Sequence, residues 1–409
     1  MNILLINHYA GSPTLGMEYR PYYMAREWVK AGHKVLIVTA SNAHVRSKQF
    51  ELNQAFEYQN IEGINYLIVN TPKYSGNSFG RIKNMFSFVS RLYFNANEII
   101  REFKPNAVIA SSTYPLDIFP ATKIAKLSKA KLIFEVHDLW PLSPMELGGY
   151  SKWHPFIMIM QMAENYAYKN ADKVVSMLPK ALEHMNAHGL KENKFEYIPN
   201  GIIIEEWDIT KELPSEHQKA IDFEKSNNHQ IIAYAGSHGI ANALDSLIEA
   251  MQKLQDKPVT LFLIGDGPEK ENLKELVKSK QIKNVQFLSS LNKNLIPSLL
   301  DIMDILYIGL QNQSLFRFGI SPNKLIDYLM AGKPIIQAIN AGNDIVKEAN
   351  CGISVEPENP AKIAEAIIQL INLSESEKTQ LGNNGHQYCL ENHDYHILSD
   401  RYIKAIIDV

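Results

Sequence analysis

Short apolar runs alternate with amphipathic stretches along the first half of the chain. An apolar run from Asn2 to Asn7 precedes a glycine loop, a helical pattern that begins near Pro21, and a buried strand at 35–39. A strand, a helix and a second strand in this order are typical of a parallel β-α-β unit. Further strands of four to six apolar residues, which suit a sheet covered on both faces, are predicted at 66–69, 107–111, 131–136 and 173–177.

The second half repeats this alternation. Strands are predicted at 231–235, 260–264, 285–288, 305–308 and 334–337, and helices at about 243–254, 268–280, 293–302, 322–331 and 359–372. A linker is predicted near 199–205, where Ile-Pro-Asn-Gly-Ile leads into a polar stretch. We therefore predict an α/β protein with two tandem Rossmann-like, doubly wound domains, and a ligand in the cleft between them. The predicted domains are residues 1–200 and 201–392, and a C-terminal helix at 393–409 is expected to pack back on the first domain.

Composition narrows the class of protein. The 409 residues are 45% hydrophobic and 21% charged, which is ordinary for a globular protein, and the net charge of −3 is too balanced for general attraction to nucleic acid. Cys351 and Cys389 have no metal-type spacing and make no disulfide framework. The N-terminus lacks the basic region of a signal peptide, and no apolar run is long enough to span a membrane. A cytoplasmic location is expected.

The segment at 316–334 is the most informative part of the sequence. Ser321 is a suitable N-cap and Pro322 a suitable first helical residue, so a helix is predicted to start there. Its free N–H groups and positive dipole end would form an anion site, to which Lys324 adds a charge. Asp327, one turn further on, would suit a ribose diol beside a diphosphate. A capped surface helix with an ordinary Lys–Asp pair explains the same spacing equally well.

Three glycine turns are weaker candidates for phosphate binding. The turns at 236–242 and 265–268 each follow a predicted strand, where glycine permits close approach of the backbone, but tight turns without a ligand are at least as common there. The loop Gly11–Gly16 is not a Walker A motif, because Met17 and Glu18 stand where Lys and Ser or Thr are required. The loop therefore argues against a P-loop ATPase and against an N-terminal NAD site. A glycine loop that closes over a ligand is still a possible interpretation.

Histidines stand at two predicted strand ends. His137 and His8 are placed to reach a cleft, although each is as readily a structural histidine. The sequence shows no Cys/His ligand cluster and no D-x-D carboxylate pair, so we expect neither a catalytic metal nor a cofactor. Residues 81–94 mix aromatic residues with Arg81, Lys83 and Arg91. This helix suits either a membrane surface and a lipid-linked substrate, or a core helix with solvated basic groups.

Six motifs in one order carry a family resemblance. They are the glycine loop, His-Asp at 137–138, Ile-Pro-Asn-Gly at 198–201, Ala-Gly-Ser at 235–237, Ile-Gly-Asp-Gly-Pro at 264–268 and Asp-Tyr-Leu-Met-Ala-Gly-Lys-Pro at 327–334. Together they resemble the GT-B glycosyltransferases of family 4, which are retaining and use nucleotide-sugars. The likeness runs from Asn2 to about Tyr402. It is greatest to bacterial transferases of O-antigen and capsule assembly, including those that transfer N-acetyl-L-fucosamine.

The resemblance implies a role for each matching position. Asp327 matches the acid that binds the ribose, Asn323 and Lys324 the helix tip at the diphosphate, and Gly16 the loop glycine near the β-phosphate. His137 matches the histidine that contacts the donor sugar, and Asn200 with Gly201 matches the hinge. We predict His137 and Lys324 as catalytic. Donor binding is predicted for Gly16, Gly236, Ser237, Asn242, Gly265, Arg317, Ser321, Asn323, Lys324 and Asp327.

Two departures from the family pattern bear on activity. Gly319 stands eight residues before Asp327, where the first acid of the family's E-x7-E motif belongs, and Ser237 and Asn242 replace the usual Arg and Lys clamp. Phosphate charge is then expected to be met by Lys324, Arg317 and backbone N–H groups.

The predicted function follows from the resemblance. It is transfer of a sugar from a nucleoside-diphosphate donor, UDP favoured and the sugar an N-acetylated deoxyhexose, to a lipid-diphosphate-linked saccharide at the inner face of the membrane. A non-hydrolysing nucleotide-sugar epimerase and a non-catalytic nucleotide-sugar-binding protein are the alternatives.

Overall fold

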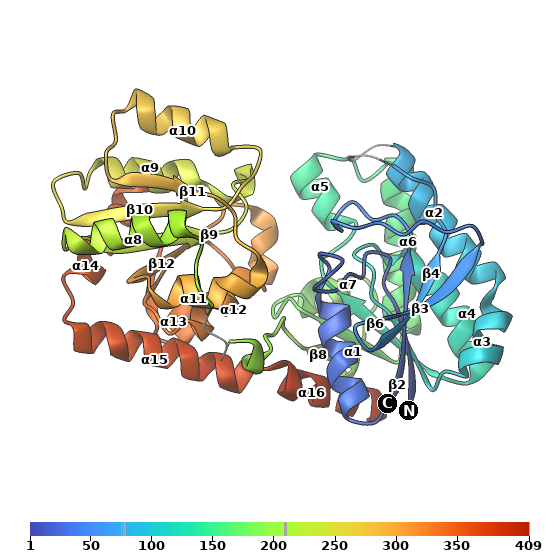
Figure 1. Ribbon diagram of the computed structural model, residues 1–409. Coiled ribbons are helices and arrows are strands. Elements are labelled where there is room, and N and C mark those ends of the chain that lie inside the picture. The colour runs from blue at the N-terminus through green and yellow to red at the C-terminus, as the bar shows by residue number, and fades with distance from the viewer. Residues whose placement is uncertain (75, 77–78, 208–210, 409) are drawn as a thin grey trace. The chain divides into compact units, whose positions relative to one another are not determined.

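The computed structural model describes residues 1–74, 76, 79–207 and 211–408, which form two compact units (Figure 1). The N-terminal unit comprises Met1–Asn200, Phe318–Ile320 and the chain from Tyr395 onward, and the C-terminal unit comprises Gly201–Arg317 and Ser321–Asp394. Each unit holds one sheet with helices packed on it. The two-domain Rossmann-like α/β architecture predicted from the sequence is confirmed.

The described residues of the N-terminal unit form an eight-stranded sheet in the order β3-β4-β2-β1-β5-β6-β7-β8, parallel except for the β3–β4 pair. Its strands are β1 (Asn2–Ile6), β2 (Lys34–Ala40), β3 (Phe56–Ile61), β4 (Ile64–Val69), β5 (Ala107–Ala110), β6 (Lys131–Val136), β7 (Lys173–Ser176) and β8 (Phe195–Tyr197). Its helices are α1 (Arg20–Lys30), α2 (Phe79–Phe94), α3 (Ala96–Phe103), α4 (Ile118–Ser128), α5 (Leu142–Gly148), α6 (Pro155–Asn170), α7 (Leu182–Ala187) and α16 (Tyr395–Ile407).

The described residues of the C-terminal unit form a six-stranded parallel sheet in the order β11-β10-β9-β12-β13-β14. Its strands are β9 (Gln230–Ala235), β10 (Val259–Ile264), β11 (Val285–Leu288), β12 (Ile305–Gly309), β13 (Ile335–Ala338) and β14 (Gly352–Val355). Its helices are α8 (Ser215–Ser226), α9 (Leu244–Gln252), α10 (Lys270–Ser279), α11 (Ile296–Asp301), α12 (Asn323–Met330), α13 (Ile345–Glu348), α14 (Pro360–Ile371) and α15 (Glu375–Asn392).

The apolar runs of the sequence became the central strands because both faces of each sheet are covered. All six residues of β10 are buried, and its neighbour β9 is buried except for its first residue. The parallel register pairs Leu4 of β1 with Leu36 on one side and Val108 on the other. Parallel strands in register end at one edge of a sheet, so the turns that follow β9, β10 and β12 are brought together.

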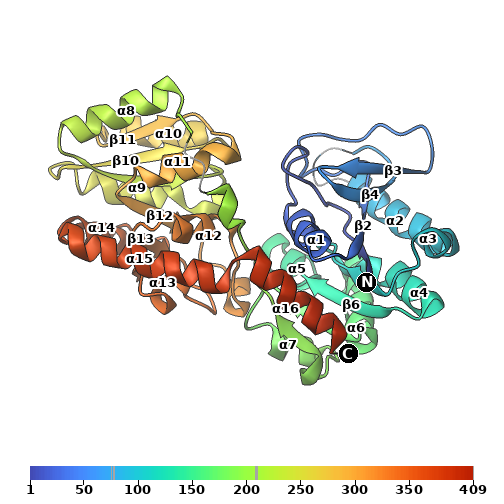
Figure 2. The same cartoon turned by 60° about the horizontal axis from the view of Figure 1, so that its bottom comes forward.

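The last helix of the chain, α16, lies against α1 in the N-terminal unit (Figure 2). The indole of Trp28 packs edge-on against Tyr402, with ring centroids 5.1 Å apart, and its Nε1 donates to the carbonyl of Ser399 at 3.2 Å. Trp28 is fully buried, so α16 supplies part of the core of this unit.

A short segment of the second half packs with the first. The sequence pattern assigns all of 316–334 to the second domain, but Phe318–Ile320 groups with the N-terminal unit. The backbone N–H of Lys180 donates to the carbonyl of Phe318 at 2.9 Å, and the Phe318 ring meets the His184 ring edge-on at 5.5 Å. These contacts are non-local, and a sequence pattern carries no sign of them. Among the described residues, no helix has the length and apolar character required to cross a membrane.

Candidate functional site

Two glycine turns touch at the carboxyl edge of the C-terminal sheet. The N–H of Gly236, just after β9, donates to the carbonyl of Ile264 at 2.9 Å, and the N–H of His238 donates to the carbonyl of Asp266 at 2.8 Å. A Cβ on Gly265 would lie 1.9 Å from the carbonyl oxygen of Gly236. Only glycine fits at 265, because the obstructing atom belongs to the backbone and cannot rotate away.

Lys324, in the first turn of α12, lies directly over the Gly236 turn. A Cβ on Gly236 would stand 2.6 Å from Cε of Lys324. The ammonium donates to Tyr234 Oη and sits 3.8 Å from the centroid of that ring. Burial lowers the pKa of Lys324 to about 7, against the opposing effect of Asp327. The structure thus brings Gly236, Gly265 and Lys324 together, and an anion arriving there would restore the full charge of the lysine.

Asp327 lies one turn further along α12. Burial raises the pKa of its carboxyl to about 6, and Lys293 and Lys324 act in the opposite direction. Lys293 belongs to the 3-10 turn that precedes α11, and the sequence analysis did not select it. No local motif marks it, because it reaches Asp327 only through the fold.

Ser237 and Asn242 shape the turn after β9. The hydroxyl of Tyr234 donates to the carbonyl of Ser237 at 2.7 Å, and the Asn242 side-chain amide donates to the same carbonyl at 3.0 Å. Asn242 therefore supports the backbone of the loop. Tyr234 was not predicted, yet it links this loop to Lys324.

His238 is buried in the same turn, and neither of its ring nitrogens has a hydrogen-bond partner within the described part of the chain. Burial, aided by Lys270, lowers its pKa to about 4, so the ring is neutral near neutral pH. Lys270 itself donates to the carbonyl of Gly265 at 2.8 Å. The sequence analysis selected neither His238 nor Lys270.

The start of α12 differs from the prediction in its capping. The helix begins at Asn323, and Pro322 occupies the capping position with an extended backbone, φ −75° and ψ 125°, and no side-chain capping bond. Ser321 is therefore one residue too early to cap. Proline has no N–H to contribute, so the first free N–H groups of the helix belong to Asn323 and Lys324.

Arg317 lies in the 3-10 turn Ser314–Phe318 and is exposed. Its Nη1 donates to the carbonyl of Ser314 at 2.6 Å. This contact lies within its own turn, and the role of Arg317 in phosphate binding stays a prediction.

In the N-terminal unit, His137 follows β6 and is the centre of a buried polar network. Its Nε2 lies 3.0 Å from Ser111 Oγ and 3.3 Å from Glu135 Oε2, and its Nδ1 lies 3.6 Å from Glu18 Oε1. Ser111 donates to Glu135 Oε2 at 2.6 Å, and Arg20 pairs with Glu135 Oε1 at 3.0 Å. His137 is thereby held between two carboxylates.

The charges of this network follow from its contacts. Burial opposes the charged form of His137, but its hydrogen bonds to the carboxylates of Glu135 and Glu18 prevail and raise its pKa to about 9. Burial also opposes the charged form of Glu135, but Arg20 and His137 lower its pKa to about 2. At neutral pH the ring is an imidazolium whose two N–H groups face Glu135 and Glu18.

The loop of Gly16 delivers Glu18 to this network. The N–H of Gly11 donates to the carbonyl of Glu18 at 2.8 Å, and the N–H of Ser12 donates to that of Gly16 at 3.2 Å, so the loop is closed on itself. Gly16 has φ 97°, and a Cβ there would lie 2.8 Å from the backbone nitrogen of Ser47. Glycine is required at this point of the loop.

His8, the other strand-end histidine, is a structural residue. It is fully buried, its Nδ1 is hydrogen-bonded to Tyr114, and burial, with a contribution from Arg46, lowers its pKa to about 3.

The basic residues of α2 do not form one edge. Arg81 lies over the rings of Tyr9 and Trp140, at 5.7 and 6.0 Å, and its Nε donates to Tyr9 Oη at 3.3 Å. Lys83 is exposed and Arg91 is half-buried. A helix turns about 100° per residue, so Arg81 and Lys83 point in different directions. A role of Arg81, Lys83 and Arg91 in binding an acceptor or a membrane stays a prediction.

Two family models match the chain, one along each unit. The model described as glycosyltransferase family 4 matches residues 15–206, and the model described as glycosyl transferases group 1 matches residues 216–388. A glycosyltransferase structure from Rickettsia africae has a TM-score of 0.70 and 16% identity, with 99% of this chain and 97% of that chain covered. Alr3699/HepE of Anabaena, solved with UDP and glucose, has a TM-score of 0.69 and 15% identity, with 100% of both chains covered.

The fold and the two family matches show that the chain is a glycosyltransferase of the GT-B type. It is 25% identical over 317 residues to WcaI of Escherichia coli K12, with 75% of each chain covered. WcaI is named as a glycosyl transferase of colanic acid biosynthesis, a bacterial polysaccharide.

Proposed function

We propose that the protein transfers a sugar, with retention, from a nucleoside-diphosphate sugar to a lipid-linked saccharide during the synthesis of a bacterial surface polysaccharide. The observation that supports binding of a nucleoside-diphosphate donor is the position of Lys324. It lies at the start of α12, over the Gly236 turn. A lysine and free helix N–H groups beside two glycine turns suit the diphosphate of a nucleotide better than any other common ligand.

The chemistry of the leaving group fits these residues. Negative charge grows on the β-phosphate as the glycosidic bond to the nucleotide breaks. Lys324, turning from Tyr234 to the phosphate, and the N–H groups of Asn323 and Lys324 stabilise that charge. The sequence has no D-x-D carboxylate pair, so we propose that these groups perform the task without a bound cofactor.

The other predicted contacts bind the ribose and the sugar of the donor. Asp327, one turn behind Lys324, accepts hydrogen bonds from the ribose hydroxyls. His137 contacts the sugar, with its Nδ1–H exchanging Glu18, 3.6 Å away, for a sugar hydroxyl. The family resemblance implies retention, with the acceptor attacking from the side of the leaving group and the diphosphate taking its proton. UDP is the preferred nucleotide in this proposal, since the neighbour from Anabaena was solved with UDP and glucose. An N-acetylated deoxyhexose remains the proposed sugar.

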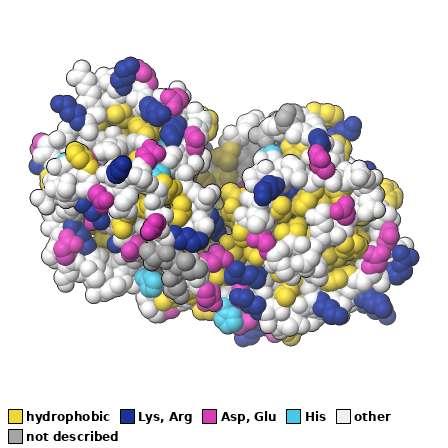
Figure 3. Space-filling view, viewed as in Figure 1, with side chains coloured by type: hydrophobic (Ala, Val, Ile, Leu, Met, Phe, Trp, Pro, Cys, Tyr) yellow, Lys and Arg dark blue, Asp and Glu magenta, His cyan; other side chains and the backbone are white. Residues whose placement is uncertain are grey.

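We place the binding site of the acceptor on the surface of the N-terminal unit. Hydrophobic side chains gather there among Lys and Arg (Figure 3). The helix α6 exposes apolar residues where a surface helix normally presents polar ones, and the chain before it adds a tryptophan and a tyrosine. These exposed residues are Leu147, Tyr150, Trp153, Met158, Ile159 and Met162. Lys152 lies 5.2 Å from the Trp153 ring, which adds a positive charge suited to anionic lipid. We call residues 147–162 the apolar surface.

The donor and the reaction are tested by a thermal-shift screen of nucleotide-sugars. It is followed by mass spectrometry of the product formed on a lipid-diphosphate-linked saccharide, and NMR of the new anomeric centre distinguishes retention from inversion. The proposal predicts one stabilising donor and a product heavier by one sugar residue. An epimerised donor without a transfer product, or binding without turnover, contradicts it.

Membrane contact is tested by sedimentation with phosphatidylglycerol vesicles. Met158→Glu combined with Met162→Glu is expected to lower the bound fraction several-fold, because each substitution places a charge in the apolar surface. Phe223→Glu is the matched control, since Phe223 is also exposed but lies on α8 of the C-terminal unit. Charge reversal at Arg81, Lys83 and Arg91 tests the original prediction for α2. Equal sedimentation of the α6 variant and the control contradicts a role for the apolar surface.

A further inference from the structure

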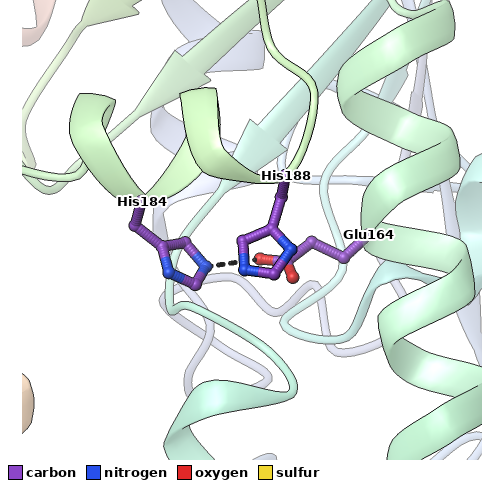
Figure 4. A group of neighbouring side chains, drawn as sticks. All are labelled: Glu164, His184 and His188. Atoms are coloured by element: carbon purple, nitrogen blue, oxygen red, sulfur yellow. Dashed lines mark hydrogen bonds and ion pairs between the residues drawn. The ribbon is translucent and has the colours of Figure 1, made fainter.

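Two histidines and a glutamate meet between α6 and α7 of the N-terminal unit, and none of the three is assigned to the reaction (Figure 4). Nε2 of His184 lies 3.1 Å from Oε1 of Glu164, and the three residues each offer a ligand atom within 4.8 Å of the others. Glu164 is almost fully buried, with 1% of its side chain exposed. The sequence shows no such cluster, because twenty residues separate Glu164 from His184.

The local fold aligns the two imidazoles. His188 is four residues after His184, and its N–H donates to the carbonyl of His184 at 3.2 Å, so the helical turn continues through it. Residues four apart lie on one helix face. The ring centroids are 4.5 Å apart, and both rings point toward Glu164 on α6 (Figure 4).

Neighbouring polar groups orient two of the three candidate ligands. Tyr168 Oη donates to Glu164 Oε1 at 3.0 Å, and Gln161 Nε2 donates to Glu164 Oε2 at 2.6 Å. Nδ1 of His188 lies 3.0 Å from Oδ1 of Asn165 and also 3.0 Å from Nε2 of Gln161. Outer groups of this kind fix ring orientation and carboxylate geometry in metal sites. Gln161 Nε2 contacts both Glu164 and His188, so its amide links these two candidate ligands.

We propose that Glu164, His184 and His188 bind a divalent transition metal ion of the Zn²⁺ type. Two imidazole nitrogens and one carboxylate oxygen are a ligand set that suits Zn²⁺, with water in a fourth position. Ligand bonds of about 2.0–2.2 Å in a tetrahedron place neighbouring ligand atoms about 3.4 Å apart. The His184–Glu164 pair, at 3.1 Å, is close to that spacing. The ligand atoms all lie within 4.8 Å of one another, so His188 would have to move inward by at most about 1.4 Å.

The bound ion would act on the packing of the N-terminal unit. It would join α6 to the turn of α7 and fix the ring of His184, on which Phe318 packs. Binding is therefore expected to stabilise the unit against unfolding, by the linkage between ligand binding and the native state. A plain hydrogen-bonded His184–Glu164 pair would give no such response to metal.

The test uses the full chain, stripped of metal with a chelator and titrated calorimetrically with ZnCl₂. Wild type is expected to bind one equivalent that raises the midpoint of thermal unfolding. His188→Gln is the preferred variant, because His188 is half-buried and its loss leaves the His184–Glu164 pair intact. It should weaken Zn²⁺ binding by well over tenfold, and Asn165→Ala, which removes an orienting group, by about ten- to a hundredfold.

His396→Gln is the matched control. His396 is exposed in the same unit and lies 3.9 Å from Glu27, so it is a His–Glu pair without the second histidine. Its substitution should leave Zn²⁺ binding unchanged. Co²⁺ in place of Zn²⁺ gives a second readout, a visible absorption band of tetrahedral metal that His188→Gln should abolish. Wild type that binds no Zn²⁺, or a folded His188→Gln variant that binds as tightly as wild type, overturns the proposal.

Discussion

The ammonium of Lys324 is held against the phenol of Tyr234, 3.8 Å from the ring centroid and hydrogen-bonded to its hydroxyl. That hydroxyl donates in turn to the carbonyl of Ser237. The contact joins the first turn of α12 to the loop after β9, so these two candidate phosphate-binding elements of the C-terminal unit share one cation. A half-buried lysine with a lowered pKa is poised to gain charge when an anion arrives.

Replacement of Lys324 by alanine is predicted to act mainly on turnover. The lysine interacts most strongly with the charge that develops on the departing diphosphate, so kcat should fall by about 10²–10³-fold, with a smaller rise in the donor KM. Steady-state kinetics with the donor found in the screen measures both. Lys347→Ala, at an exposed lysine of α13, is the control and should behave as wild type. Wild-type kcat and KM in Lys324→Ala would refute the assignment.

The affinity for UDP is predicted to fall as the pH rises above neutrality. Burial places the pKa of Lys324 at about 7 in the free protein, and a diphosphate favours the charged form. Above that pH, binding must supply a proton to the lysine, so Kd should rise by up to about tenfold per pH unit. Calorimetry between about pH 6 and pH 9 gives the slope.

The control for this pH dependence is Lys324→Arg, because a guanidinium stays charged throughout this range. Its Kd should be nearly constant. The same rise of Kd in both proteins would assign the titration to another group. A constant Kd in wild type would contradict the predicted titration of Lys324.

Gly236 and Gly265 are predicted to differ in what they control. An alanine at 236 meets the flexible end of Lys324 at 2.6 Å, so the lysine is displaced and UDP binding weakens, while the φ of 155° adds a smaller backbone strain than the clash at 265. An alanine at 265 meets the carbonyl oxygen of Gly236 at 1.9 Å, so the turns separate and the unit is destabilised. Thermal unfolding and UDP titration of both variants distinguish the two effects. Gly236→Ala with wild-type affinity would show that Lys324 does not need its present position.

Glu135→Gln is predicted to destabilise the protein by about 3–5 kcal/mol, because it leaves the buried charge of Arg20 without a negative partner, with only the carbonyls of Ile198 and Pro199 still accepting from it. The pKa of Glu135 falls from 4.5 to about 2 on folding, so its contribution is present above pH 4.5 and lost as the pH falls toward 2. The pKa of His137 rises from 6.5 to about 9, so its contribution is present below pH 6.5 and lost as the pH rises through 9.

Urea unfolding of Glu135→Gln at several pH values measures these effects. Glu51→Gln is the control, since its ion pair with Lys73 is largely exposed and should contribute little. A variant as stable as wild type at every pH would mean that the Arg20–Glu135 pair does not stabilise the unit.

The sequence predicted most of the fold because its strands are buried on both faces and therefore read as apolar runs. It missed β3, whose Phe-Glu-Tyr-Gln-Asn-Ile is half exposed at the antiparallel edge of the sheet. It also missed β14, a partly exposed edge strand. Edge strands have one unpaired side and tolerate polar residues, so their pattern is weak.

The candidate site was less predictable. Lys324 and Asp327 could be found because one helix holds both, at a spacing that the helix fixes. Tyr234 and His238 acquire their positions from contacts between separate turns, which leave no local pattern. The network of His137 combines Glu18, Ser111 and Glu135, which are far apart in the sequence. The capping of α12 was predicted one residue early, because Ser321 and Pro322 both suit a helix start.

The most direct measurement is a crystal structure of the protein with UDP bound. The β-phosphate should lie within hydrogen-bond distance of Nζ of Lys324 and of the N–H groups that open α12, with the ribose hydroxyls against Asp327. A diphosphate bound elsewhere on the protein, with Lys324 still hydrogen-bonded to Tyr234, would contradict the role of α12 in holding the leaving group.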